Sequence, residues 1–152
     1  MYFRPNFAPL GSTLEADLFT PDIVIPTLKI AVGAVTVIFV ASLAALASGR
    51  KRLHGRINVV FFVLTLSAVL GLELIIRFAT PNFTAGFSPD DKQALFIHLC
   101  FSIPAAIVLP FMLFSGKTHR TWHVKLAILF SALWIGTFVT GIFYLPSSFP
   151  KP

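Results

Sequence analysis

Hydrophobic positions along the chain gather into four long runs separated by short polar stretches. The runs cover 27–48, 57–79, 93–114 and 122–145, and each ends at or close to a glycine or proline. A helix needs roughly 20 mostly apolar residues to cross about 30 Å of hydrocarbon, and every run has that length. The pattern predicts an all-α integral membrane protein whose four helices form an up-down bundle.

Composition supports this class and excludes others. Of 152 residues, 56% are hydrophobic and 12% are charged, whereas a soluble domain carries roughly 25% charged residues. A single cysteine, Cys100, excludes a disulfide-stapled secreted scaffold. The segment 1–26 contains prolines and acids but no apolar core of a signal peptide, so we interpret it as an external arm. Residues 146–152 are interpreted as an external tail.

Charge predicts the orientation of the bundle. The linkers after the first run and before the fourth are basic and contain no acid, while all six acids lie elsewhere. The positive-inside rule then places both basic linkers in the cytoplasm, and both termini and the 80–92 loop outside. Because these cations stand beside apolar runs, we expect them to meet anionic lipid headgroups and not nucleic acid.

Small residues indicate where the helices approach one another. In the fourth run Ala132, Gly136 and Thr140 recur at every fourth position, which gives a narrow stripe suited to close helix packing in lipid. Short linkers make the first and second runs, and the third and fourth, antiparallel neighbours. Trp134 in the fourth run is interpreted as a packing or lipid-facing residue.

Ionisable residues inside the spans are candidates for function. Glu73 and Arg77 lie four residues apart, in the order that favours an ion pair, and we expect this pair to be buried. His98 and Lys29 are predicted at the same depth in the outer leaflet. This cluster either binds a cofactor edge, a quinone head or a proton, or forms a satisfied network that locks the second and third spans together.

The remaining histidines lie at the inner edge of the membrane. His54 opens the second span and His123 opens the fourth, so the two can meet at the depth that bis-histidine ligation of a b-type haem requires. A haem enclosed by this chain alone is disfavoured; a haem at the rim, or shared with another subunit, stays open. His119 and His123, four apart, can hold a metal together with His54. The alternative is hydrogen bonding to headgroups or backbone, and the ligand stays open among haem b, quinone and tightly bound lipid.

A scattered pattern from 49 to 145 resembles a small bacterial family of four-span membrane proteins, catalogued as domain of unknown function number 420. It consists of Arg-Leu-His54-Gly-Arg-Ile, Arg77, His98, His119-Arg-Thr-Trp-His123, Trp134 and Thr140-Gly141. The family is often encoded near haem–copper oxidase. The resemblance implies a role beside a respiratory or other redox complex in the bacterial inner membrane, with His54, His98 and His123 at the positions of the family's histidines.

These features lead to one expected function and two alternatives. The sequence contains no complete catalytic set, and the arm and the acidic outer loop favour a docked protein. We therefore expect a non-catalytic accessory subunit of a membrane redox complex, whose partners are the bilayer and other membrane subunits. The alternatives are a haem- or quinone-binding electron-transfer protein, using His54 and His123 or His98 with Glu73 and Arg77, and an oxidase assembly factor that uses the same histidines.

Overall fold

The computed structural model describes residues 21–74, 77–78, 84 and 86–146. They form four long α-helices: α2 (Pro21–Ala47), α3 (Lys51–Leu74), α4 (Pro89–Thr118) and α5 (Arg120–Val139), and α5 continues into a π-helical turn, η2 (Thr140–Tyr144). Four segments are long and apolar enough to cross a membrane: Ile23–Ala47, Lys51–Leu74, Pro89–Gly116 and Arg120–Tyr144. The prediction of an all-helical chain with four helices long and apolar enough to span a membrane is confirmed.

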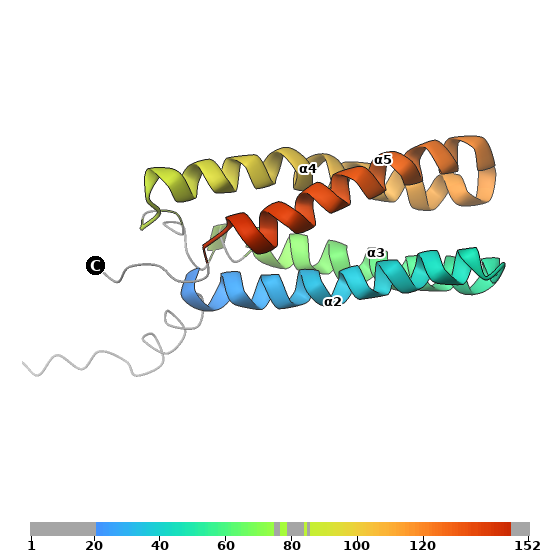
Figure 1. Ribbon diagram of the computed structural model, residues 1–152, viewed down its shortest axis with the longest axis horizontal. Helices are drawn as coiled ribbons and strands as arrows, with labels where there is room; N and C mark the ends of the chain where they lie inside the picture. The colour runs from blue at the N-terminus through green and yellow to red at the C-terminus, as the bar shows by residue number, and fades with distance from the viewer. Residues whose placement is uncertain (1–20, 75–76, 79–83, 85, 147–152) are drawn as a thin grey trace, which may run out of the picture.

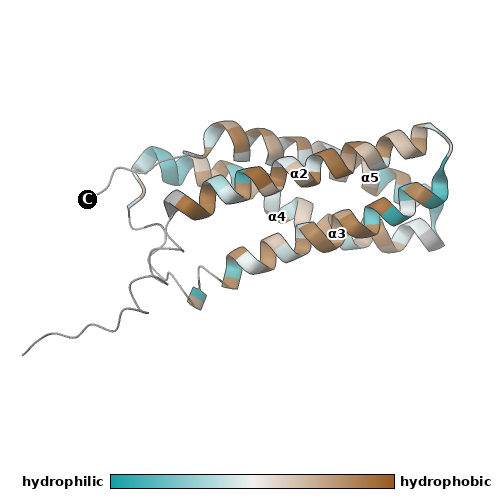
Figure 2. Ribbon diagram, turned by 90° about the horizontal axis from the view of Figure 1, so that it is seen from below, coloured by the Kyte–Doolittle hydropathy of each residue, from teal (hydrophilic) through white to brown (hydrophobic). Residues whose placement is uncertain are grey.

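The bundle consists of two helical hairpins laid against each other (Figure 1). α2 packs mainly on α3 and α4 mainly on α5, with sparser contact between the two hairpins. Both tight turns, at 48–50 and at 118–119, lie at one end of the bundle, here called the hairpin end. The start of α2, the start of α4 and the end of η2 lie at the opposite, open end. Figure 2 shows that the hairpin end is hydrophilic and the helix shafts are mostly apolar.

The helices begin earlier than the apolar runs that predicted them. α4 starts at Pro89, where the Ser88 hydroxyl accepts a hydrogen bond from the Asp91 backbone N–H and the Asp91 carboxylate accepts one from the Ser88 N–H. This capping box satisfies two backbone donors at the start of the helix. α2 starts at Pro21, so Pro26 lies inside this helix instead of before it. The arm predicted for 1–26 otherwise lies outside the described residues, as does the tail at 147–152.

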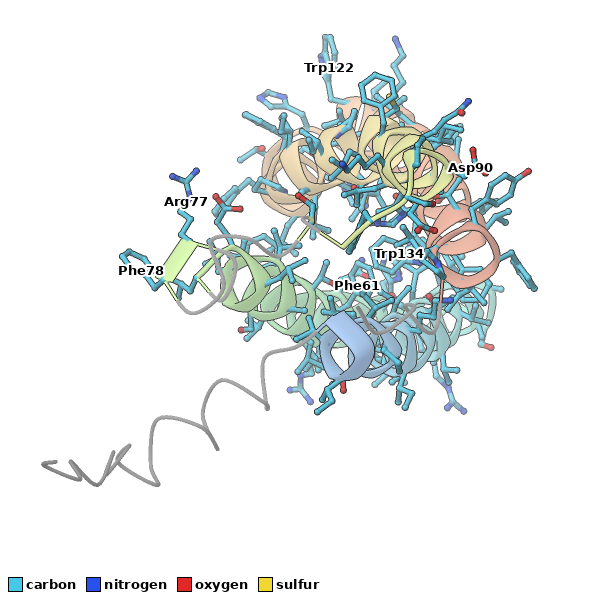
Figure 3. The ribbon with its side chains drawn as sticks, turned by 90° about the vertical axis from the view of Figure 1, so that its left-hand side faces the viewer. Phe61, Arg77, Phe78, Asp90, Trp122 and Trp134 are labelled. Carbon is cyan, nitrogen blue, oxygen red and sulfur yellow. The ribbon has the colours of Figure 1, made fainter. Side chains whose placement is uncertain are left out.

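An aromatic cluster joins the two hairpins in the middle of the bundle. Phe39 from α2, Phe61 from α3, and Phe130 and Trp134 from α5 meet with ring centroids 5.0–6.4 Å apart. Phe61 and Phe130 are fully buried, and Figure 3 shows Phe61 and Trp134 between the helices. The Trp134 Nε1–H donates to the Thr36 hydroxyl at 3.2 Å. Trp134 is therefore a packing residue, one of the two roles that the sequence predicts for it.

The outer surface of the bundle is apolar on every helix. Large side chains such as Ile30, Phe96, Ile128 and Phe143 are about 70% exposed, an arrangement typical of contact with lipid and not with water. Trp122, near the start of α5, is exposed and lies under the Lys125 ammonium group.

Candidate functional site

His54 belongs to a buried polar network between α2 and α3, near the hairpin end. Its Nδ1 lies 2.9 Å from both the hydroxyl and the carbonyl oxygen of Ser42, and its Nε2 lies 3.1 Å from Asn58 Nδ2. The Ser42 hydroxyl in turn lies 2.6 Å from Asn58 Oδ1. Ser42 is completely buried and Asn58 nearly so.

One assignment of protons satisfies the whole network. The Ser42 hydroxyl donates to Asn58 Oδ1, the Asn58 amide donates to His54 Nε2, and His54 Nδ1–H donates to the Ser42 carbonyl oxygen. The Ser42 carbonyl oxygen can only accept, so Nδ1 carries the proton and Nε2 is the acceptor. The ring of bonds occupies both nitrogens of the imidazole. His54 therefore keeps no lone pair for a metal or haem iron unless the bond from Asn58 breaks.

His123 makes the corresponding contact in the other hairpin. Its Nδ1 lies 2.8 Å from the Met112 carbonyl oxygen, so Nδ1–H donates across the α4–α5 turn. A Cβ at Gly116 would lie 3.3 Å from the His123 ring, so the glycine leaves room for the imidazole. This arrangement fixes the tautomer and leaves the Nε2 lone pair available, as in histidines that ligate metals.

The structure does not bring the predicted metal ligands together. His54 and His123 bond within separate hairpins, and no hydrogen bond joins them within the described residues. His119 is exposed at the junction of α4 and α5, and its carbonyl oxygen accepts from the His123 backbone N–H at 2.9 Å. The described part of the chain holds no group of three histidine, cysteine or acidic side chains arranged for a metal.

His98 holds α4 to the end of α5. Its Nδ1 lies 3.0 Å from the Thr140 hydroxyl, which donates to the Gly136 carbonyl oxygen at 2.7 Å. The hydroxyl can therefore accept from His98 Nδ1–H. A Cβ at Gly141 would lie 3.0 Å from the imidazole, so this glycine allows the ring to approach. The contact stands where the α-helix changes to the π-helical turn η2.

Glu73 and Arg77 form the ion pair that the sequence predicts. The expectation that the pair is buried is wrong, because the side chains of Arg77 and Glu73 are 70% and 51% exposed. Figure 3 shows Arg77 directed away from the bundle. The reason is that Glu73 lies in the last turn of α3, which packs on α2 and only weakly on α4, so this end of the helix has an uncovered side.

The predicted cluster of four ionisable residues is therefore divided. Glu73 pairs with Arg77, His98 bonds to Thr140, and the Lys29 ammonium group donates to the Leu145 carbonyl oxygen. The ion pair is local, whereas the other two contacts join α4 to η2 and α2 to the residue that follows η2. No hydrogen bond in the described residues joins His98 to the ion pair.

Sequence reasoning missed Ser42, Asn58 and the carbonyl oxygen of Met112. A signal for Asn58 was present, because it is the only amide side chain in the apolar run 57–79, and polar groups inside spans need partners. The Met112 carbonyl oxygen could not be singled out from the sequence, because every residue carries the same backbone group.

Comparison with known proteins found no match: no family model, no curated protein and no solved structure matches the chain. The resemblance to the four-span bacterial family stays a prediction. Four of the residues on which it rests nevertheless make the same kind of contact in this structure. His54, His98, His123 and Trp134 each hydrogen-bond to a neighbouring helix.

Proposed function

We propose that this chain is a non-catalytic accessory subunit of a membrane-embedded redox complex, in the inner membrane of a bacterium. The observation that carries the proposal is the use of His54, His98 and His123. Each imidazole bonds to a neighbouring helix of its own hairpin, and each therefore contributes to a rigid bundle. The redox context comes from the family resemblance, whose histidines are these three.

The proposed orientation puts the hairpin end in the cytoplasm. The first turn of α3 and the residues before it carry Arg50, Lys51 and Arg52, and α5 begins with Arg120. Asp90 and Asp91 lie in the first turn of α4 at the open end. Because short cytoplasmic loops are enriched in lysine and arginine, this polarity favours an inside position for the turns and an outside position for the open end.

The uncovered outer part of α3 is the proposed contact with a partner subunit. Glu73, in the last turn of α3, and Arg77, just beyond it, present a negative and a positive group side by side, exposed, next to an apolar helix surface. Because the two opposite charges are paired, they add little net charge at the membrane boundary. The same pair can fix the position and orientation of a polar group on a partner subunit. A neighbouring subunit could therefore pack on the apolar surface of α3 and hydrogen-bond to the Glu73–Arg77 pair.

A second candidate is transient handling of haem or a metal during oxidase assembly, and His123 favours it. Its Nδ1 bond to a backbone carbonyl leaves Nε2 as a free acceptor at the hairpin end. A haem ligated by both His54 and His123 does not fit this chain, because His54 uses both nitrogens on Ser42 and Asn58. His123 fits as one ligand when a partner protein supplies the others.

Copurification tests the accessory role. The tagged chain, extracted in mild detergent, is expected to carry redox subunits in fixed stoichiometry by mass spectrometry. Replacing Glu73 and Arg77 with glutamine should reduce that yield, and Asp90→Asn, an exposed acid elsewhere at the open end, should not. A monodisperse single chain under all extraction conditions would contradict the proposal. A visible haem spectrum that disappears in His123→Ala would favour the second candidate instead.

A further inference from the structure

An open groove lies between α2 and α3 at the surface of the bundle. Its volume is about 330 Å³, and it is lined by Ile38, Ala41, Arg56, Ile57 and Val60. Four of these side chains are apolar, and Arg56 is the only charged one. The groove therefore combines one cation with a hydrocarbon-like wall.

The cation and the apolar wall lie at different depths. Arg56 is between His54 and Asn58, near the hairpin end, whereas Val60 precedes Phe61 of the central aromatic cluster. At 1.5 Å per residue, Val60 lies about 6 Å farther into the bundle than Arg56. Ile38, beside Phe39 of the same cluster, extends the wall in the same direction. The groove thus runs from a charge near the membrane boundary toward the middle of the membrane.

A second cation lies one helical turn from Arg56, toward the start of α3. Arg52 precedes Arg56 by four residues on α3, and both are exposed, so the two guanidinium groups project from one face of the helix. Within the described residues the only side-chain ion pair is Glu73–Arg77, so neither arginine has a carboxylate partner there. Guanidinium groups bind phosphate through two parallel N–H donors.

We propose that this groove is a binding site for one anionic phospholipid. Arg56, with Arg52, binds the headgroup phosphate, and an acyl chain lies along Ile38, Ala41 and Val60. The site goes beyond the proposed accessory function and does not depend on the partner complex. Charge complementarity at the mouth and the apolar wall behind it select a lipid over a soluble phosphate compound, because a soluble compound would leave the wall uncovered.

Native mass spectrometry of the purified full chain tests the site, using phosphatidylglycerol and phosphatidylcholine at equal concentration. Wild type is expected to retain one phosphatidylglycerol in preference to phosphatidylcholine. Arg56→Gln should lower that retention by about tenfold, a typical loss for one charge-assisted contact. Arg120→Gln removes the same charge at the hairpin end of the other hairpin and should retain the lipid like wild type.

A second variant separates the groove from its charge. Ala41→Trp fills the groove and leaves every charge in place, so it should also lower lipid retention, while Ile128→Trp on the exposed side of α5 should not. Equal losses in Arg56→Gln and Arg120→Gln would overturn the proposal in favour of general electrostatic attraction. Equal retention of phosphatidylcholine would overturn it as well. So would thermal stabilisation by inorganic phosphate alone that matches the effect of the lipid.

Discussion

α4 and α5 pack tightly at Gly136, where Phe101 of α4 lies against the glycine, and replacing this glycine with alanine tests how strictly the hairpin is packed. An added Cβ would lie 2.3 Å from Phe101 Cδ1, 2.7 Å from Cγ and 2.8 Å from Cε1. Ordinary contact needs about 3.4 Å or more. Since Cγ lies on the Cβ–Cγ bond, rotating the ring about this bond does not move Cγ and does not relieve the clash. Either the Phe101 side chain leaves its rotamer or the two helices separate.

Two opposing effects decide the magnitude. Overpacking a well-packed site costs typically about 1–3 kcal/mol, and alanine is favoured over glycine in a helix by about 1 kcal/mol. The clash at Gly136 is severe, so the first effect should dominate. We expect Gly136→Ala to lower the free energy of unfolding by roughly 1–2 kcal/mol.

Thermal unfolding in detergent, followed by circular dichroism, measures this loss. Gly33→Ala is the matched control, because no atom lies within 4 Å of a Cβ built there; it should be neutral or stabilising. The double variant Gly136→Ala with Phe101→Ala should be more stable than the sum of the single changes predicts, because the clash is gone. Equal melting temperatures for Gly136→Ala and Gly33→Ala, or simple additivity in the double variant, would refute the reasoning.

Three other changes have expected outcomes in the same unfolding assay. Ser42→Ala opens the buried ring of hydrogen bonds and should cost about 1–3 kcal/mol, whereas Ser48→Ala, which removes an exposed hydroxyl bonded to its own helix, should cost little; equal effects would contradict the network. Trp134→Phe keeps a ring in the aromatic cluster but loses the indole donor, which should cost about 0.5–1.5 kcal/mol. A cost near that of Trp134→Ala would contradict this separation of ring packing from the hydrogen bond. Asp91→Ala removes the carboxylate that accepts from the Ser88 N–H and should cost about 0.5–1.5 kcal/mol, more than Glu73→Gln at the exposed ion pair; the reverse order would show that the ion pair stabilises the bundle.

The spans were predictable because membrane crossing depends on a property that can be read along the chain, the length of an apolar run. The helix starts were less so. Ser88 and Asp91 lie in a polar segment, and their capping box extends α4 beyond the hydrocarbon-like part of the sequence. In the same way Lys51 and Arg52 belong to the first turn of α3, since a helix does not have to end where its apolar residues end.

The site was predictable where it is local. Glu73 and Arg77 are four residues apart, and helical geometry alone brings them together. His98 was expected beside them because of its depth, but depth does not say which helix a side chain faces. That depends on the packing of α4 against α5, where Thr140 and Gly141 receive the imidazole. The partners of His54 and His123 were missed for the same reason.

Cysteine labelling in intact cells tests the central claim most directly, namely that the chain crosses the membrane four times with both hairpin turns on the cytoplasmic side. In a background with Cys100 replaced by alanine, single cysteines are placed at Ser48, Thr118 and Gly86. We expect a membrane-impermeant maleimide to label Gly86→Cys in intact cells and to reach the other two positions only after permeabilisation. Labelling of either turn from outside would contradict the orientation, and labelling of one turn but not the other would contradict the four-span fold itself.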